Sequence, residues 1–159
     1  LHGGWMHLIG NMAYLYIFGD NIEDELGKIK FIIFYIFCGI FAALCQALID
    51  ISSEIPMIGA SGAISGILGA YLILFPKKDI KVFFWFFIFI KIFRIPAMYV
   101  IGFWIFIQFF SLNYSEESNI AYMAHIGGFI AGIILIFIFR KKMSRQTKRL
   151  SKGSLPNSN

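Results

Sequence analysis

The segment GASGAISGILGAYLILF at residues 59–75 decides the fold and the chemistry that we expect of this chain. It is almost wholly apolar, and a helix needs about 17–25 such residues to cross a bilayer. Ser61 lies near its start, with Gly59 and Gly62 close by. Polar groups inside membrane segments are costly, so by default they are candidates for function. The segment therefore predicts a membrane helix that carries a potential nucleophile.

The composition places the rest of the chain in the same class. Of its 159 residues 58% are hydrophobic and 14% are charged, whereas a soluble domain has about 45–50% apolar and about 25% charged residues. Five apolar stretches are long enough to be candidates for spanning helices: residues 5–19, 29–50, 59–75, 97–112 and 119–139. We therefore predict an all-α, polytopic transmembrane helix bundle. Residues 1–140 are expected to form the membrane domain, and residues 141–159 a basic, disordered cytoplasmic tail.

A sixth apolar stretch, residues 80–93, is short and flanked by basic residues. If it does not cross and the other five helices alternate, all 14 Lys and Arg residues fall on one side of the membrane. Such a bias marks the cytoplasmic side, so residues 80–93 are predicted to lie at that surface. The net charge of +5 is thus a topology signal and not a sign of nucleic-acid binding. The basic tail is expected to contact anionic membrane lipid.

His125, in the last apolar stretch, is a candidate partner for Ser61. Ser61 lies 14 residues before Phe75, and His125 lies 14 residues before Phe139. At 1.5 Å per residue, both lie about 21 Å above the inner boundary of a core about 30 Å thick. Gly62-x-x-x-Gly66 in one stretch and Gly128-x-x-x-Gly132 in the other would let the two helices pack closely. Equal depth and close packing predict that the hydroxyl and the imidazole can form a hydrogen bond.

The first apolar stretch carries a second polar cluster. His7 and Asn11 are spaced by four residues, so they share one face of a helix. Acyl transfer requires donors for an oxyanion, and His, Asn and backbone N–H groups can all serve. We predict such a site from His7, Asn11 and the N–H of Ser61. His2 is expected to be structural, because its spacing from His7 puts it on a different face, which also argues against a metal site.

These motifs closely resemble those of the rhomboid family of intramembrane serine proteases. The resemblance rests on three motifs in the family's order and on an acidic loop at residues 19–27. The motifs are His2-x4-His7-x3-Asn11, Gly59-Ala60-Ser61-Gly62, and Ala124-His125-Ile126-Gly127-Gly128 followed by Gly132.

The resemblance implies an enzyme with a six-helix core that cleaves peptide bonds in or near the transmembrane segments of other membrane proteins, without a cofactor. It implies that Ser61 is the nucleophile and His125 the general base, in a dyad that lacks an acidic third member. It also implies that His7, Asn11 and the Ser61 backbone form the oxyanion hole, and that Gly59 lines the site.

Two features depart from the family pattern. The chain has five predicted spans where the family has six, so we expect that a preceding helix and its following loop are missing from this sequence. Many relatives also carry an aromatic residue four positions after the nucleophile, where it stacks on the catalytic histidine. Here that position is Ser65. The imidazole is therefore expected to be held less firmly, or by another group.

Other interpretations stay open at this point. Ser61 and His125 could be packing residues, and His7 and Asn11 could be interhelical hydrogen-bonding groups. A catalytically silent relative that binds membrane proteins for quality control or trafficking would carry the same fold. A channel or transporter has less support, because the spans contain no deep charged residue and no broken helix within an internal repeat. The abundance of Ile, Phe, Lys and Asn hints at a bacterial inner membrane.

Overall fold

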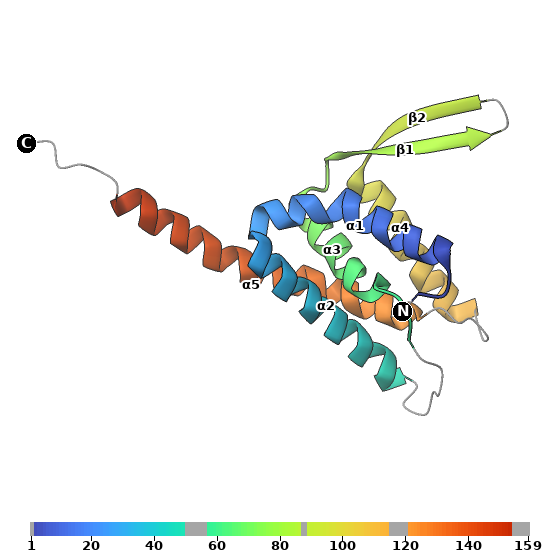
Figure 1. The fold of residues 1–159 in the computed structure, drawn as a ribbon, viewed down its shortest axis with the longest axis horizontal. Helices are drawn as coiled ribbons and strands as arrows, with labels where there is room; N and C mark the ends of the chain where they lie inside the picture. The colour runs from blue at the N-terminus through green and yellow to red at the C-terminus, as the bar shows by residue number, and fades with distance from the viewer. Residues whose placement is uncertain (1, 50–56, 87–88, 115–120, 154–159) are drawn as a thin grey trace, which may run out of the picture.

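The computed structural model describes residues 2–49, 57–86, 89–114 and 121–153. These residues form a helical bundle with one β-hairpin (Figure 1), which confirms the predicted fold class. The elements, in chain order, are α1 (Trp5–Leu26), α2 (Lys28–Ile49), α3 (Ser61–Leu74), β1 (Asp79–Phe86), β2 (Phe89–Pro96), α4 (Ala97–Tyr114) and α5 (Tyr122–Gly153).

Helix α3 lies at the centre of the bundle and contacts α1, α2, α4 and α5 (Figure 1). Its glycines lie between α2 and α5, and the backbones of α3 and α5 come together there. A Cβ atom added at Gly128 would overlap the carbonyl oxygen of Gly62, and one added at Gly132 would overlap that of Gly66. Small residues allow this approach between membrane helices. The predicted backbone-to-backbone packing of the two segments is therefore confirmed.

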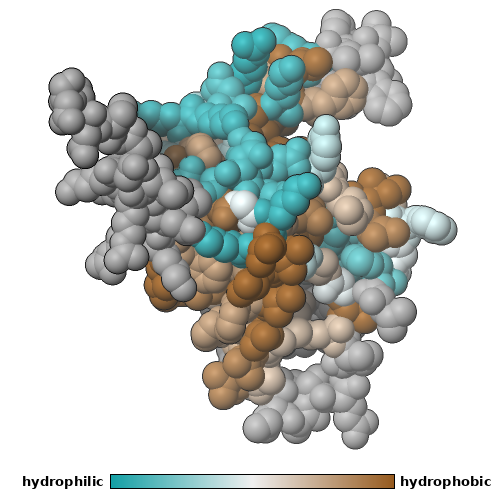
Figure 2. All heavy atoms as spheres, turned by 60° about the vertical axis from the view of Figure 1, so that its left-hand side comes forward, coloured by the Kyte–Doolittle hydropathy of each residue, from teal (hydrophilic) through white to brown (hydrophobic). Residues whose placement is uncertain are grey.

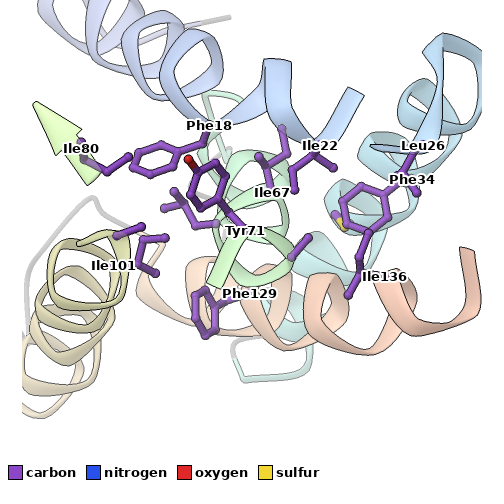
Figure 3. Close-up of a cluster of buried hydrophobic side chains, with 14 residues drawn as sticks. Phe18, Ile22, Leu26, Phe34, Ile67, Tyr71, Ile80, Ile101, Phe129 and Ile136 are labelled. Atoms are coloured by element: carbon purple, nitrogen blue, oxygen red, sulfur yellow. The ribbon is translucent and has the colours of Figure 1, made fainter. Parts of the chain in front are cut away.

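The second half of α3 packs large side chains against the neighbouring elements. Figure 3 shows Phe18, Tyr71 and Ile80 meeting where α1, α3 and β1 come together. The rings of Phe18 and Tyr71 are 5.0 Å apart and nearly perpendicular, at 89°. Lipid tails are as apolar as these side chains, so close van der Waals packing, and not removal from water, favours the cluster.

The outer surface of the bundle is apolar. On α2 the exposed large side chains include Ile29, Ile33, Phe37, Ile40 and Leu44, and Figure 2 shows hydrophobic residues gathered below a cap of hydrophilic ones. Two described helices are long and apolar enough to cross a membrane, over Lys28–Leu48 and Tyr122–Arg140. Two further apolar helices, Ser61–Leu74 and Ala97–Leu112, are shorter.

Polar contacts gather several basic segments at one end of the bundle. Lys78, in the turn after α3, donates a hydrogen bond to the side chain of Asn21 on α1. Arg140 on α5 forms an ion pair with Glu25 on α1, with 3.1 Å between Nε and Oε1. The ends of three helices that were predicted to lie on the same side therefore do meet. Their cytoplasmic location stays a prediction.

Two helices are longer than predicted. Helix α1 continues through the expected acidic loop to Leu26 and ends at Gly27, which has a left-handed φ of 78°. Ile22 and Leu26 are buried one turn apart, so this acidic segment has an apolar face that packs as a helix. Helix α5 continues to Gly153, so the expected disordered tail is helical up to that residue. Residues 154–159 lie outside the described part of the chain.

The described residues of the segment at 80–93 belong to two paired strands, β1 and β2, which the sequence reasoning did not foresee. Their antiparallel register runs from Asp79 opposite Pro96 to Phe86 opposite Phe89, and the pair projects away from the helices (Figure 1). Isoleucine, valine and aromatic residues favour extended backbone. The base of the pair is closed by hydrogen bonds from the N–H groups of Ala97 and Met98 to the carbonyls of Lys78 and Pro76.

Candidate active site

Ser61 is the first residue of α3, and the backbone before it is unusual. Gly59 has φ 102°, a left-handed conformation that residues with a side chain rarely adopt. This turn directs the chain into the helix, whose first residues have N–H groups without carbonyl partners in their own helix. One turn later, the hydroxyl of Ser65 donates a hydrogen bond of 2.6 Å to the carbonyl oxygen of Ser61. Because Ser61 is the first residue of α3, it lies at the positively polarised end of that helix.

His125 lies in the first turn of α5 and reaches Ser61. Its Nε2 is 2.8 Å from the Oγ of Ser61, so the contact predicted from equal depth is present. Both side chains are half-buried. The start of α5 is tied to α2, because the N–H of Ala124 donates to the side-chain oxygen of Gln46 over 3.2 Å. The chemical roles of Ser61 and His125 stay predictions.

The other ring nitrogen of His125 has a partner on α4. Its Nδ1 is 2.7 Å from Oε1 of Gln108, a residue that is only 7% exposed. The amide nitrogen of Gln108 in turn donates to the carbonyl oxygen of Trp104 over 3.3 Å. Sequence reasoning missed Gln108. A signal was available, because Gln108 is a polar residue inside an apolar span and so meets the criterion that singled out Ser61.

An aromatic ring also packs on His125 from α4. The rings of Trp104 and His125 are 5.8 Å apart and tilted by 43°. Trp104 also contacts Phe129, one turn after His125, with 6.4 Å between the ring centroids. Because position 65 of α3 is a serine, that position offers no aromatic ring to the imidazole. Trp104 of α4 provides an aromatic ring instead. The sequence left open an imidazole that is held less firmly or one that is held by another group, and Trp104 and Gln108 on α4 are candidates for such a group.

His7 and Asn11 lie on α1 beside the turn that precedes Ser61. A Cβ atom added at Gly59 would be 2.7 Å from Nε2 of His7 and 3.8 Å from Nδ2 of Asn11. The N–H of Gly3 donates to Nδ1 of His7 over 3.3 Å, so Nδ1 accepts and Nε2 carries the hydrogen in the neutral ring. The amide of Asn11 donates to the carbonyl oxygen of His7 over 2.8 Å, which uses one of its two hydrogens. Within the described residues, His7 and Asn11 therefore each keep an N–H donor beside Gly59.

His2 is closer to His7 than predicted. Their rings are 5.3 Å apart and nearly perpendicular, at 79°. The prediction that the two lie on different faces was wrong, because α1 begins only at Trp5 and His2 precedes it. The Nε2 atom of His2 is buried and has no hydrogen-bond partner among the described residues. Its contact with the His7 ring is in keeping with the structural part expected of it.

Together these contacts place a hydroxyl, an imidazole and several N–H donors around the start of α3. A family model for the rhomboid domain matches residues 1–142. The chain belongs to the rhomboid family. Rhomboid proteins are integral membrane proteins, which agrees with the polytopic bundle and the apolar outer surface.

Named relatives share much of this chain. It is 28% identical to the putative rhomboid protease YdcA of Bacillus subtilis over 148 residues, which are 92% of this chain and 66% of that protein. It is 28% identical to the mitochondrial Rhomboid protein 1 of Saccharomyces cerevisiae over 93% of this chain and 42% of that protein. RHOMBOID-like protein 5 of Arabidopsis thaliana is 40% identical over 45% of this chain and 23% of that protein. The chain thus spans between about a quarter and two thirds of the length of these relatives.

Proposed function

We propose that this rhomboid protein is an intramembrane serine endopeptidase that hydrolyses peptide bonds in or near the transmembrane segments of other membrane proteins. The observation that carries the proposal is the distance of 2.8 Å between the Oγ of Ser61 and the Nε2 of His125. A hydroxyl that is hydrogen-bonded to an imidazole is the pairing that nucleophilic catalysis by serine requires. Membership of a family that includes a putative rhomboid protease supports the same reaction.

The reaction proceeds through an acyl-enzyme. Oγ of Ser61 attacks the carbonyl carbon of the scissile bond while Nε2 of His125 takes the hydroxyl proton. The tetrahedral intermediate collapses as His125 gives that proton to the departing amine, which leaves the acyl group on Ser61. Water, deprotonated by the same Nε2, then attacks the ester and restores the free hydroxyl. The dyad therefore needs one imidazole to act first as a base and then as an acid.

The negative oxygen of the intermediate would lie at the start of α3. The N–H of Ser61 and the positive end of the helix favour negative charge there. His7 and Asn11 border Gly59 and supply further donors. In a site with little water each such donor lowers the barrier more than it would in solution.

The substrate must offer an extended backbone, because the peptide bonds of an intact membrane helix are shielded by their own hydrogen bonds. We therefore propose that the substrate is a membrane protein whose helix can unwind near the cleavage site. Gly59 has no side chain, so His7 and Asn11 can lie against the backbone beside Ser61, where that extended backbone would bind. The basic end of the bundle would face the cytoplasm.

The test is labelling of the protein in membranes with a fluorescent fluorophosphonate, which reacts with activated serines. We expect the unchanged protein to label, and Ser61→Ala and His125→Ala to lose the label while remaining folded. Ser65→Ala keeps Ser61 and His125 and removes only the hydrogen bond from the Ser65 hydroxyl to the carbonyl oxygen of Ser61, so it should still label. A folded protein that does not label would favour a silent, binding-only rhomboid. A label that persists in Ser61→Ala would exclude Ser61 as the nucleophile.

A further inference from the structure

We infer that Gln108 is a positioning residue that holds His125 in the tautomer the reaction needs. The Oε1 atom of Gln108 accepts a hydrogen bond from the Nδ1–H group of His125, on the side of the ring opposite to Ser61. The inference rests on the proposed function, since the tautomer matters for catalysis only if His125 is the base.

The orientation of the Gln108 amide follows from its two partners. One end faces the carbonyl oxygen of Trp104, which can only accept a hydrogen bond, so that end must be the NH₂ group. The other end, Oε1, is therefore the one that faces Nδ1 of His125. A reversed amide would place two acceptors against each other in a buried site, which is costly.

This orientation determines where the imidazole carries its hydrogen. The oxygen of a carboxamide has no hydrogen to give, so Nδ1 must be the donor. In the neutral ring Nε2 then has a lone pair, and that lone pair faces the hydroxyl of Ser61. In the opposite tautomer Nε2 would donate to Ser61 and could not take its proton. Gln108 thus stabilises the one neutral form in which His125 is a base.

A neutral partner suits this location. Gln108 is 7% exposed within a predicted span, and an ionised carboxylate there would have to be buried in the membrane domain at a high free-energy cost. Serine hydrolases with an acidic third residue orient the histidine in the same way, but they also stabilise the imidazolium with a charge. Gln108 supplies the orientation without the charge.

Nitrogen-15 NMR of histidine-labelled protein in lipid tests the inference directly. The chain has only 3 His, so His125→Ala assigns the His125 signals. We expect a protonated Nδ1 and a bare Nε2 in the unchanged protein, and a mixture of tautomers in Gln108→Met. Fluorophosphonate labelling of Gln108→Met should be slower by about 10- to 100-fold. Gln108→Glu, measured at a pH where the new carboxyl is protonated, can still donate to the carbonyl oxygen of Trp104 and accept from Nδ1 of His125, so it should restore the native tautomer and most of the rate.

The matched control is Gln46→Met. Gln46 also bonds to the start of α5, but through the N–H of Ala124 and not through the imidazole. It should lower thermal stability and leave the His125 tautomer unchanged. A protonated Nε2 in the unchanged protein, or a Gln108→Met protein with the native spectrum and rate, would overturn the inference. If the native protein shows the expected tautomer but never labels, the proposed function fails and the orientation of the ring stands.

Discussion

The two sides of His125 are built in different ways. Towards α3 the packing is backbone against backbone. Gly62 and Gly66 contact Gly128 and Gly132, a contact that we call the glycine seam. Ser61 lies at the end of this seam. Towards α4 the contacts are made by side chains, with Trp104 against the ring and Gln108 at Nδ1. The first side brings the reacting groups within hydrogen-bonding distance, and the second orients one of them. We therefore expect changes on the α3 side to remove the fold or the reaction, and changes on the α4 side to slow it.

The largest effect is expected from Gly128→Ala, which tests the glycine seam itself. The added methyl group would overlap the carbonyl oxygen of Gly62, and a backbone cannot move aside as a flexible side chain can. Overpacking of this kind costs about 1–3 kcal/mol or more, so both the free energy of unfolding in mixed micelles and the fluorophosphonate label should fall sharply. Gly102→Ala on α4 is the control, because a Cβ there meets no described atom within 4 Å. Equal stability of the two variants would show that the seam is not tightly packed.

Next comes Gly59→Ala, which addresses the turn before Ser61. The new Cβ would lie 2.7 Å from Nε2 of His7 and would force a left-handed φ on alanine. We expect labelling to fall by about 10²–10³-fold, the loss seen when an oxyanion donor is removed, while most of the fold remains. Gly27→Ala carries a comparable strain, at φ 78°, but meets no described atom within 4 Å. If Gly27→Ala slowed labelling equally, strain and not the displacement of His7 would be the cause.

The same contrast explains what could be predicted from the sequence. Membrane depth and glycine spacing are properties of single helices, so the meeting of Ser61 and His125 could be predicted from counting residues. The contacts of Gln108 and Trp104 depend on how α4 is rotated about its axis. Gln108 is a single polar residue in the middle of that apolar span, so it could suggest an inward-facing side but not which residue of another helix it meets.

Local backbone preference explains the other differences. The hairpin at Asp79–Pro96 has charges at its ends and aromatic residues between them, a pattern that suits a surface helix as well as a pair of strands. The extension of α5 to Gly153 was not predicted because charge and polarity were taken as signs of disorder. Lysine and arginine are nevertheless good helix formers, and they continue a helix that the membrane span has already begun.

A smaller effect is expected from Trp104→Leu, which removes the ring that packs on His125. Aromatic contacts of this kind are worth about 0.5–1.5 kcal/mol, so we expect labelling to slow by roughly threefold to tenfold. Trp104→Phe keeps an aromatic ring and should retain most of the rate. Phe106→Leu is the control, since Phe106 is an exposed aromatic residue on the same helix. A Trp104→Leu protein with the native rate would mean that Gln108 alone orients the imidazole.

The smallest effect is expected where α1 and α5 meet at the basic end of the bundle. The ion pair of Arg140 with Glu25 is exposed, with 57% and 28% of the two side chains accessible, and such pairs contribute about 0–1 kcal/mol. Glu25→Gln should therefore leave the fluorophosphonate label unchanged and lower the free energy of unfolding by less than about 1 kcal/mol. Combining it with Arg140→Gln in a double-mutant cycle isolates the pair. A loss of labelling in either variant would mean that the active site depends on how α1 is held against α5, and not only on the α3–α5 seam.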